Sequence, residues 1–213
     1  MVKTKGRCSV CGTECTPIKA RTHLLECTAQ AKSTTKGYLV RVSWAAQPNL
    51  YWMFIALPQE ASLSLLDQFL RNTWVECCGH LSEFIIEDYC YESHTESGSS
   101  SHSMNKKVEQ LLSPGMQFEY VYDMGSSTRL ILGVMDAITI GTPKKITILM
   151  RNDLPVFPCE SCKMPSEIIC SFCGKRMCSD CSEEHPCAVE EDETYMLTPL
   201  LNSPRSGVCG YGG

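Results

Sequence analysis

Residues 159–187 read CESCKMPSEIICSFCGKRMCSDCSEEHPC and contain seven cysteines and one histidine. Six of the cysteines form three C-x2-C pairs, and His185 and Cys187 follow them. The turn between two cysteines at this spacing points both sulfurs the same way, so that one tetrahedral zinc ion can bind both thiolates. The eight potential ligands are enough for two closed sites. A segment this short cannot bury a core of its own, so we expect metal to supply its folding energy.

The spacing of this cluster, C-x2-C-x7-C-x2-C-x4-C-x2-C-x3-H-x-C, resembles that of the cross-brace HIT and MYND fingers. In those fingers ligand pairs one and three share one metal ion, and pairs two and four share the other. The resemblance implies a first zinc site made of Cys159, Cys162, Cys178 and Cys181. It implies a second zinc site made of Cys170, Cys173, His185 and Cys187.

One feature of the last ligand pair departs from those families. The single residue between His185 and Cys187 is a tighter spacing than they show, and Cys209 in the C-terminal tail is an alternative to Cys187. Iron–sulfur ligation is the alternative to zinc for the whole cluster. HIT and MYND fingers are mostly protein-docking modules, and the acidic run around residues 183–193 would repel phosphate. We therefore expect this end of the chain to dock a protein.

The N-terminal segment 1–30 contains a separate group of potential ligands. They are Cys8, Cys11, His23 and Cys27, spaced C-x2-C-x11-H-x3-C. Thr16 and Pro17 are typical of the first residues of a helix. His23 and Cys27 would then lie one turn apart on the same helix face, as a shared metal ion requires. The pattern predicts a C2HC zinc finger, with Cys15 as a spare ligand; the alternative is a basic terminus with incidental cysteines.

Two kinds of partner are compatible with this finger. Its His-Leu-x-x-Cys ending at residues 23–27 resembles C2HC fingers of the ubiquitin-binding type, which use the helix for protein contact. Residues 1–36 also carry seven basic and two acidic side chains, although the whole chain has a net charge of −5. The basic residues that could meet phosphates are Lys3, Lys5, Arg7, Lys19 and Arg21.

The chain has 213 residues and 15 cysteines, and its longest apolar run, Leu50–Leu57, is too short to span a membrane. The basic start runs directly into a C-x2-C pair with no apolar stretch that would indicate a secretory signal. We therefore expect a cytoplasmic protein without membrane contact, whose cysteines bind about three zinc ions rather than form disulfides.

Residues 37–150 predict a domain between the two zinc modules. Residues 38–44 alternate as in a half-buried strand, and 50–57 are apolar on both faces as in an interior strand. A helix is expected from Ser62 to Trp74, a polar loop over 92–105, and a hairpin of strands around 124–127. The pattern predicts an α+β domain with a mostly antiparallel sheet and packed helices. The Cys-rich module with its acidic tail would then occupy 155–213.

This central domain resembles the plasmid ORF-3-like family, also known as insertion-element passenger, TnpR-like proteins. The resemblance lies in Leu66-Asp67, Trp74, His80-Leu81, Phe84 and the run FEYVYDMG at 118–125. It implies an α+β sheet wrapped by helices, but no defined activity. The chain departs from the family at residues 126–130, so no metal or catalytic role is carried over from that region.

Four further potential ligands fall in the central domain, namely Cys77, Cys78, His80 and Cys90. A vicinal cysteine pair suits one tetrahedral ion poorly, and cysteine is often buried in ordinary cores. We therefore expect core packing here, with a fourth metal or redox site as the alternative.

The leading hypothesis is a cytoplasmic multi-zinc adaptor that docks macromolecular partners through structural fingers. The first alternative is binding of nucleic acid or a ribonucleoprotein, for example the ribosome, led by the basic finger. The second is an enzyme with a cleft near His80, the face of Tyr120 and Tyr122, and Asp123. We expect no enzyme, because the spacing shows neither a nucleophile–base pair nor an open metal site.

Overall fold

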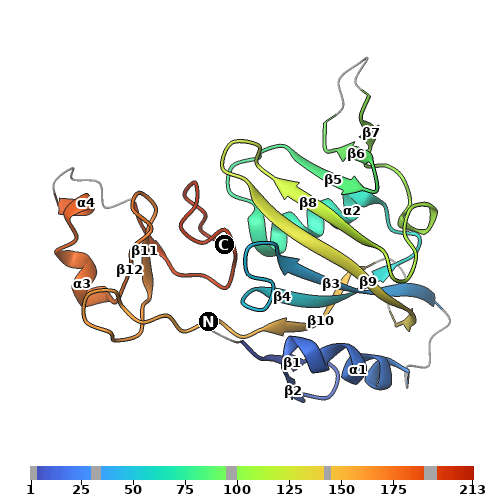
Figure 1. Cartoon of the computed structure of the whole chain (residues 1–213), viewed down its shortest axis with the longest axis horizontal. Coiled ribbons are helices and arrows are strands. Elements are labelled where there is room, and N and C mark those ends of the chain that lie inside the picture. Colours follow the sequence, from blue (N-terminus) through green and yellow to red (C-terminus); the bar gives the residue numbers. More distant parts are fainter. Residues whose placement is uncertain (1–3, 30–34, 95–99, 142–144, 190–195) are drawn as a thin grey trace.

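The strands predicted at residues 38–44 and 50–57 lie at the centre of a ten-stranded sheet (Figure 1). They are β3 (Thr35–Trp44) and β4 (Trp52–Pro58). The computed structural model describes residues 4–29, 35–94, 100–141, 145–189 and 196–213. The strand order of the sheet is β2-β1-β10-β4-β3-β9-β8-β5-β6-β7, and all of its pairings are antiparallel except β6 with β7.

The remaining strands of this sheet are β1 (Gly6–Cys8), β2 (Glu14–Cys15), β5 (Ser82–Ile86), β6 (Tyr89–Glu92), β7 (His102–Ser103), β8 (Gln117–Tyr122), β9 (Thr128–Ile140) and β10 (Thr147–Asn152). Its helices are α1 (Pro17–Thr28), α2 (Leu63–Leu70), the π-helical turn η1 (Arg71–Val75) and the 3-10 turn η2 (Val108–Gln110). We call this unit, residues 4–152, the large lobe. The fold is mixed and mostly strand, with some helices on one large antiparallel sheet.

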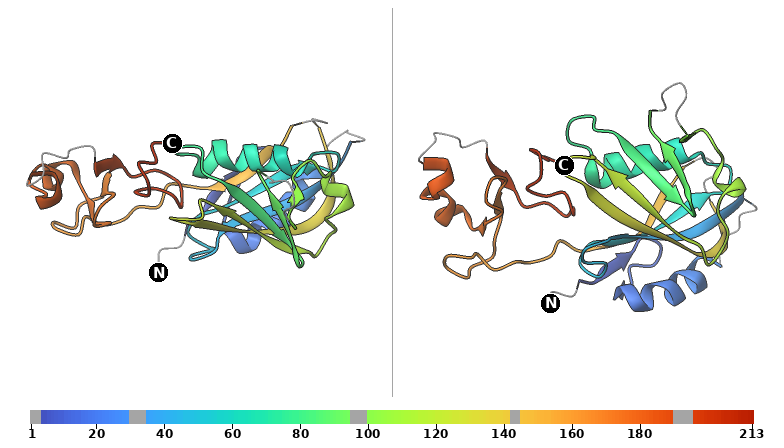
Figure 2. Two further views of the ribbon diagram at one scale, coloured as in Figure 1. Left: turned by 90° about the horizontal axis from the view of Figure 1, so that it is seen from above. Right: turned by 45° about the horizontal axis from the view of Figure 1, so that its top comes forward.

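A small lobe, residues 155–199, lies beside the large lobe (Figure 1). It contains the three-stranded sheet β12-β11-β13 and two short helices. These elements are β11 (Ile168–Cys170), β12 (Arg176–Met177), α3 (Ser179–Glu183), α4 (Pro186–Val189) and β13 (Leu197–Pro199). Residues 200–213, which we call the C-terminal tail, leave β13 and lie between the small lobe and the large lobe (Figure 2).

The sheet of the large lobe has an apolar cluster on each face. On β3, Val40 and Val42 belong to the cluster that includes α2, whereas Leu39 belongs to the cluster that includes α1. On β4, Ile55 joins the first cluster and Phe54 the second. The prediction that β4 is buried on both faces is therefore confirmed, and the sheet has helices over both of its faces.

The predicted helix after Ser62 is also confirmed. The Ser62 side chain accepts a hydrogen bond from the Leu65 backbone N–H at 3.1 Å and caps α2. The apolar stripe continues through η1 to the fully buried Trp74. The polar loop predicted over 92–105 is wrong in part, because β6 ends at residue 92 and β7 occupies 102–103. Residues 95–99 lie outside the described ranges. In the described part of the chain, no helix is both long and apolar enough to span a bilayer.

Candidate metal centres

The structure brings histidine and cysteine side chains together in four clusters, and within each cluster the potential ligand atoms lie within 4.8 Å of one another. The N-terminal cluster is Cys8, Cys11, His23 and Cys27. The interlobe cluster is Cys77, Cys78, His80 and Cys209. The two small-lobe clusters are Cys159, Cys162, Cys178 and Cys181, and Cys170, Cys173, His185 and Cys187.

The spacing of the ligand atoms fits a tetrahedral zinc ion. Zinc–sulfur and zinc–nitrogen bonds of about 2.3 and 2.0–2.1 Å place two sulfurs about 3.8 Å apart, and a sulfur and a nitrogen about 3.6 Å apart. The Sγ atoms of Cys8 and Cys27 are 4.0 Å apart, and those of Cys162 and Cys178 are 3.5 Å apart. Each cluster can therefore hold one metal ion, and its sulfur–nitrogen or all-sulfur composition favours zinc.

The N-terminal cluster combines a knuckle and a helix. In the knuckle Cys8-Ser-Val-Cys-Gly12, the Gly12 backbone N–H donates to the Cys8 carbonyl at 2.9 Å, and Gly12 has a φ of +77° that favours glycine. Pro17 begins α1, which places His23 and Cys27 one turn apart. The His23 Nε2 atom is then 3.3 Å from the Cys11 Sγ atom. Local sequence is sufficient to assemble this cluster.

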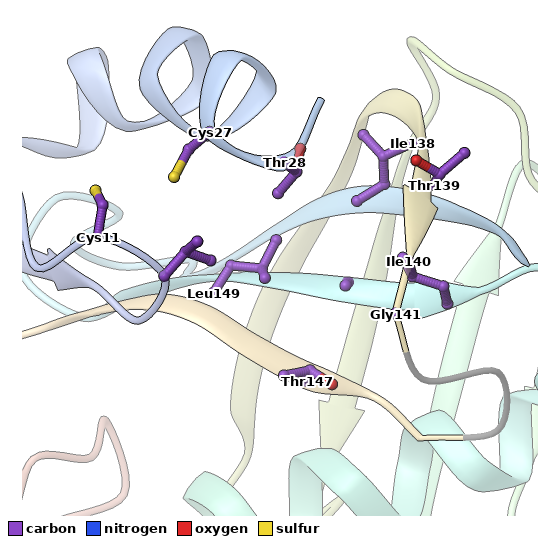
Figure 3. Close-up of a pocket in the computed structure, with 11 residues that line it drawn as sticks. Cys11, Cys27, Thr28, Ile138, Thr139, Ile140, Gly141, Thr147 and Leu149 are labelled. Carbon is purple, nitrogen blue, oxygen red and sulfur yellow. The ribbon is translucent and has the colours of Figure 1, made fainter. Parts of the chain in front are cut away.

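Strand β1 joins the N-terminal cluster to the sheet, since it pairs with β10. Cys8 and the spare Cys15 are buried in the apolar cluster under α1, and Cys15 is not part of the ligand group. Beside them is an open pocket of about 450 Å³. Figure 3 shows Cys11 and Cys27 at one end of this pocket and residues 138–141 at the other.

The two small-lobe clusters use their ligand pairs in the interleaved order that the HIT and MYND resemblance implies. Cys187 lies in the second cluster with His185, and Cys209 does not replace it. The knuckle at 170–174 repeats the Cys-Ser-x-Cys-Gly sequence and geometry of the first, with a 2.8 Å bond from the Gly174 N–H to the Cys170 carbonyl. In the third knuckle, residues 159–163, the position that is glycine in the other two is Lys163, which also has a positive φ, +72°.

The small lobe has little apolar material apart from its ligands. Among its described residues the buried cluster consists of Cys159, Cys170 and Met177. The His185 ring is buried, and its Nε2 atom is 3.4 Å from the Cys173 Sγ atom. Its Nδ1 atom has no hydrogen-bond partner among the described residues. The ring therefore points its one engaged nitrogen at the thiols, and metal ligation accounts for a fold this small.

The pKa values of the cysteine thiols diverge within the clusters. Hydrogen bonds with the Thr13 side chain and backbone lower the pKa of Cys11 to about 6. Burial and a hydrogen bond with Cys11 raise the pKa of Cys27 to about 11. Hydrogen bonds with neighbouring thiols raise the pKa of Cys78 and of Cys181, and burial followed by a hydrogen bond with Cys173 raises the pKa of Cys187. A divalent cation is what allows several adjacent thiols to be thiolates together.

The interlobe cluster bears on two expectations. Cys77 is half-buried and packs against the apolar core as expected, but it also meets Cys78, His80 and Cys209 of the C-terminal tail. Cys90 lies apart on β6 opposite Ile85. The described residues contain four such clusters, one more than the expected count of about three ions requires. The chain bends at residues 77–78 after η1, which brings the two vicinal sulfurs to 3.4 Å. No local spacing signals Cys209 as their partner.

Asp123, a residue of the hypothetical catalytic cleft, directly follows β8, in which alternate residues face opposite ways. The alternation puts it on the face of Glu119, but a φ of +65° turns it inward, where it is buried. Its Oδ2 atom accepts a 2.6 Å hydrogen bond from Nη2 of the fully buried Arg205. Burial opposes ionisation of Asp123, but the Arg205 hydrogen bond prevails and holds the pKa of Asp123 below its usual range.

Tyr120 and Tyr122, the other residues of the hypothetical catalytic cleft, take part in an internal network. The Tyr120 hydroxyl donates to the Asp67 carboxylate at 2.7 Å, and the Tyr122 hydroxyl donates to Glu76 at 2.8 Å. Burial, followed by the Asp67 charge, raises the pKa of Tyr120. The Tyr120 phenol therefore holds the sheet to α2, and the Tyr122 phenol holds it to the residue that follows η1.

The basic residues of the N-terminal finger differ in their surroundings. Lys5 pairs with Glu14 at 2.7 Å, and Arg21 lies 3.8 Å from Asp136. Arg7 and Lys19 are exposed, and Lys3 lies outside the described residues. Part of the positive charge of the finger is therefore balanced within the large lobe.

Exposed apolar side chains occur on the knuckles. Val10 and Phe172 hold the same position in the two Cys-Ser-x-Cys-Gly knuckles, and their exposures are 59% and 71%. Met164, next to the knuckle at 159–163, is also exposed. Sequence reasoning missed these residues, although the repeated motif could have revealed them.

Comparison with known proteins gives no functional assignment. No family model matches the chain, and a search of curated proteins found no match. Among solved structures, the crystal structure of a protein of unknown function, MM3350 from Methanosarcina mazei Go1, is similar with a TM-score of 0.46 and 16% sequence identity. The similarity covers 55% of this chain and 68% of that chain.

Proposed function

We propose that this chain is a cytoplasmic multi-zinc docking protein whose fingers bind a protein partner. Each cluster supplies four ligands, and four protein ligands fill a tetrahedral zinc ion without leaving a position for water or substrate. Closed sites of this kind stabilise structure, so we propose no catalytic role. The fifteen free cysteines support a reducing compartment.

The observation that carries this proposal is the pair of apolar knuckle tips. A single exposed apolar residue needs no explanation, but Val10 and Phe172 repeat one position on two rigid loops. Val10 also lines the pocket beside the N-terminal cluster, whose other walls include Ile138, Ile140 and Leu149. A knuckle tip next to an apolar recess offers a partner both an anchor and a cavity.

Quantitative recovery of partners with the tagged chain tests the proposal. The variants are Val10→Ser and Phe172→Ser, each of which leaves the zinc ligands intact. Tyr89→Ser, at an exposed aromatic residue on β6, is the matched control. Loss of a central anchor costs more than about 1.4 kcal/mol, so at least one knuckle variant should lower affinity for the recovered partner about tenfold or more. Unchanged recovery with both knuckle variants would refute docking through these tips.

Binding of nucleic acid or a ribonucleoprotein is the alternative, and it rests on the exposed Arg7 and Lys19. It is weaker because Lys5 and Arg21 have acidic neighbours. Retention on RNA or DNA that falls with salt and is lost in an Arg7→Gln, Lys19→Gln double variant would favour it over protein docking. The docking proposal predicts equal retention of this variant and the original chain.

We also infer that residues 37–150 of the large lobe form an α+β domain of the plasmid ORF-3-like type. What supports this is the place of the residues that carry the resemblance. Leu66, Trp74 and Phe84 are fully buried in the apolar cluster that includes α2. Asp67 accepts hydrogen bonds from Tyr120 and from Ser82. These residues build a fold rather than an active site.

A further inference from the structure

The interlobe cluster differs from the other three in the origin of its ligands. Each of the others takes its ligands from one segment of the chain, at 8–27, 159–181 or 170–187. Cys78 and Cys209, by contrast, lie 131 residues apart. We propose that Cys77, Cys78, His80 and Cys209 bind one zinc ion that fastens the C-terminal tail, and with it the small lobe, to the large lobe.

The geometry of the cluster is that of a metal site before any ion is added. The Cys78 Sγ atom lies 3.4 Å from Cys77 Sγ and 3.5 Å from Cys209 Sγ. The His80 Nε2 atom lies 2.9 Å from Cys78 Sγ and 3.3 Å from Cys209 Sγ. Three of these separations are about 0.3–0.4 Å shorter than the edges of a tetrahedral zinc site, which are about 3.6–3.8 Å, and the fourth, between His80 and Cys78, is about 0.7 Å shorter.

Two other uses of these side chains fit less well. A disulfide requires sulfurs about 2.05 Å apart, which is far shorter than either sulfur separation in the cluster. A nucleophilic thiol requires a base whose second ring nitrogen is held by a third group. Here Asp123 approaches the same His80 nitrogen that faces the thiols, with 3.6 Å between Oδ2 and Nε2. A metal ion is the occupant that uses all four groups.

Arg205 supports thiolate formation at the same place. Its Nε and Nη2 atoms lie 3.4 and 3.3 Å from the Cys77 Sγ atom. Outer-shell donors of this kind commonly accompany metal ligands. The guanidinium thus links the carboxylate of Asp123 to a sulfur ligand.

The tail already contacts the large lobe upstream of Cys209. The Asn152 side-chain amide donates a 2.7 Å hydrogen bond to the Asn202 side-chain oxygen. The Asn202 side-chain amide donates a second 2.7 Å hydrogen bond to the Asn152 backbone carbonyl. Ser203 Oγ donates to the Trp74 carbonyl at 2.6 Å, and the Trp74 indole N–H donates to the Asn202 carbonyl at 3.1 Å. The tail continues from β13, which pairs with β11 of the small lobe. An ion on Cys209 therefore closes the connection between the lobes.

This site should also be the most accessible of the four. The N-terminal and both small-lobe clusters each contain a buried cysteine, namely Cys8, Cys159 and Cys170. In the interlobe cluster Cys78 and Cys209 are exposed, and Cys77 and His80 are half-buried. A chelator should remove this ion first, so metal availability would control how firmly the lobes are joined.

Native mass spectrometry combined with hydrogen exchange tests the proposal on the full chain. The original protein should carry four zinc ions, and Cys209→Ser should carry three. Cys90→Ser, at a half-buried cysteine outside the clusters, is the control and should keep four. Cys209→His offers a replacement ligand and should recover the fourth ion. In Cys209→Ser, exchange should become faster in residues 200–213 and stay unchanged in 159–187.

Three results would overturn the proposal. One is a Cys209→Ser protein that retains four ions. Another is loss of the ion with no change in exchange of the tail. The third is an original protein whose intact mass is about 2 Da low, which would indicate a disulfide in the cluster. Since Val10 and Phe172 lie outside this cluster, failure of the docking experiment would leave the inference intact.

Discussion

The buried ion pair between Asp123 and Arg205 provides a sharp test of how the tail is held. Arg205 is 0% exposed, and Nη2 donates to Asp123 at 2.6 Å. Its Nη1 atom donates to the Ser126 carbonyl at 2.8 Å and to the Thr128 hydroxyl at 3.1 Å. Asp123→Asn removes the negative charge, keeps the side-chain shape, and leaves the guanidinium buried without its carboxylate.

The magnitude follows from the burial of both partners. Removal of one member of a buried ion pair costs about 3–5 kcal/mol, because the other charge is left uncompensated. We expect the lower end, about 3 kcal/mol, because the amide oxygen of asparagine can still accept a hydrogen bond. For a chain of this size each kcal/mol lowers Tm by about 2–4 °C, so the melting temperature should fall by about 6–12 °C.

The assay is the melting temperature, measured on the original protein and its variants at the same zinc content. Asp136→Asn is the control variant. Asp136 lies 3.8 Å from Arg21, and both side chains are about half exposed. Exposed pairs contribute about 0–1 kcal/mol, so the control should melt close to the original protein. If Asp123→Asn melts within about 2 °C of Asp136→Asn, the buried pair does not hold the tail and the reasoning is refuted.

Three further changes have defined outcomes. In Gly6→Ala the new Cβ would clash with the Arg151 carbonyl oxygen, so overpacking should cost about 1–3 kcal/mol in urea unfolding. Gly141→Ala, whose new Cβ would meet no atom of the described residues within 4 Å, should change stability by less than about 0.5 kcal/mol, and equal losses would contradict the β1–β10 register. Leu66→Ala, in the core beside α2, should cost about 2–5 kcal/mol by the same measurement, and a loss below about 1 kcal/mol would contradict its burial. Full zinc removal should abolish the protection of backbone amides from hydrogen exchange in residues 159–187, while most of the ten-stranded sheet stays protected. Protection that persists in residues 159–187 would contradict metal-driven folding.

The parts of this structure that sequence reasoning predicted are those specified by neighbouring residues. Strand β4 was recognisable because Trp52 to Pro58 is apolar on both faces. The helix after Ser62 was recognisable from its cap and its apolar stripe. The knuckles at 8–12 and 170–174 depend on a fixed two-residue spacing and a glycine that accepts positive φ. In each case a short stretch contains all the information.

The parts that sequence reasoning missed depend on contacts between distant residues. Cys209 meets Cys78 across 131 positions, and no periodicity signals such a pair. Asp123 departs from the alternation of β8 because its own backbone is left-handed, which turns its side chain toward Arg205. The pairing of β1 with β10 also could not be predicted, because a strand of three residues is too short to show an alternation of apolar and polar side chains.

Metal content per chain is the measurement that tests the central claim most directly. Elemental analysis of folded protein, purified without added metal or chelator, should give four zinc ions per chain, one for each cluster. Folded protein that contains iron, or no transition metal at all, would contradict the claim that closed zinc sites build this molecule.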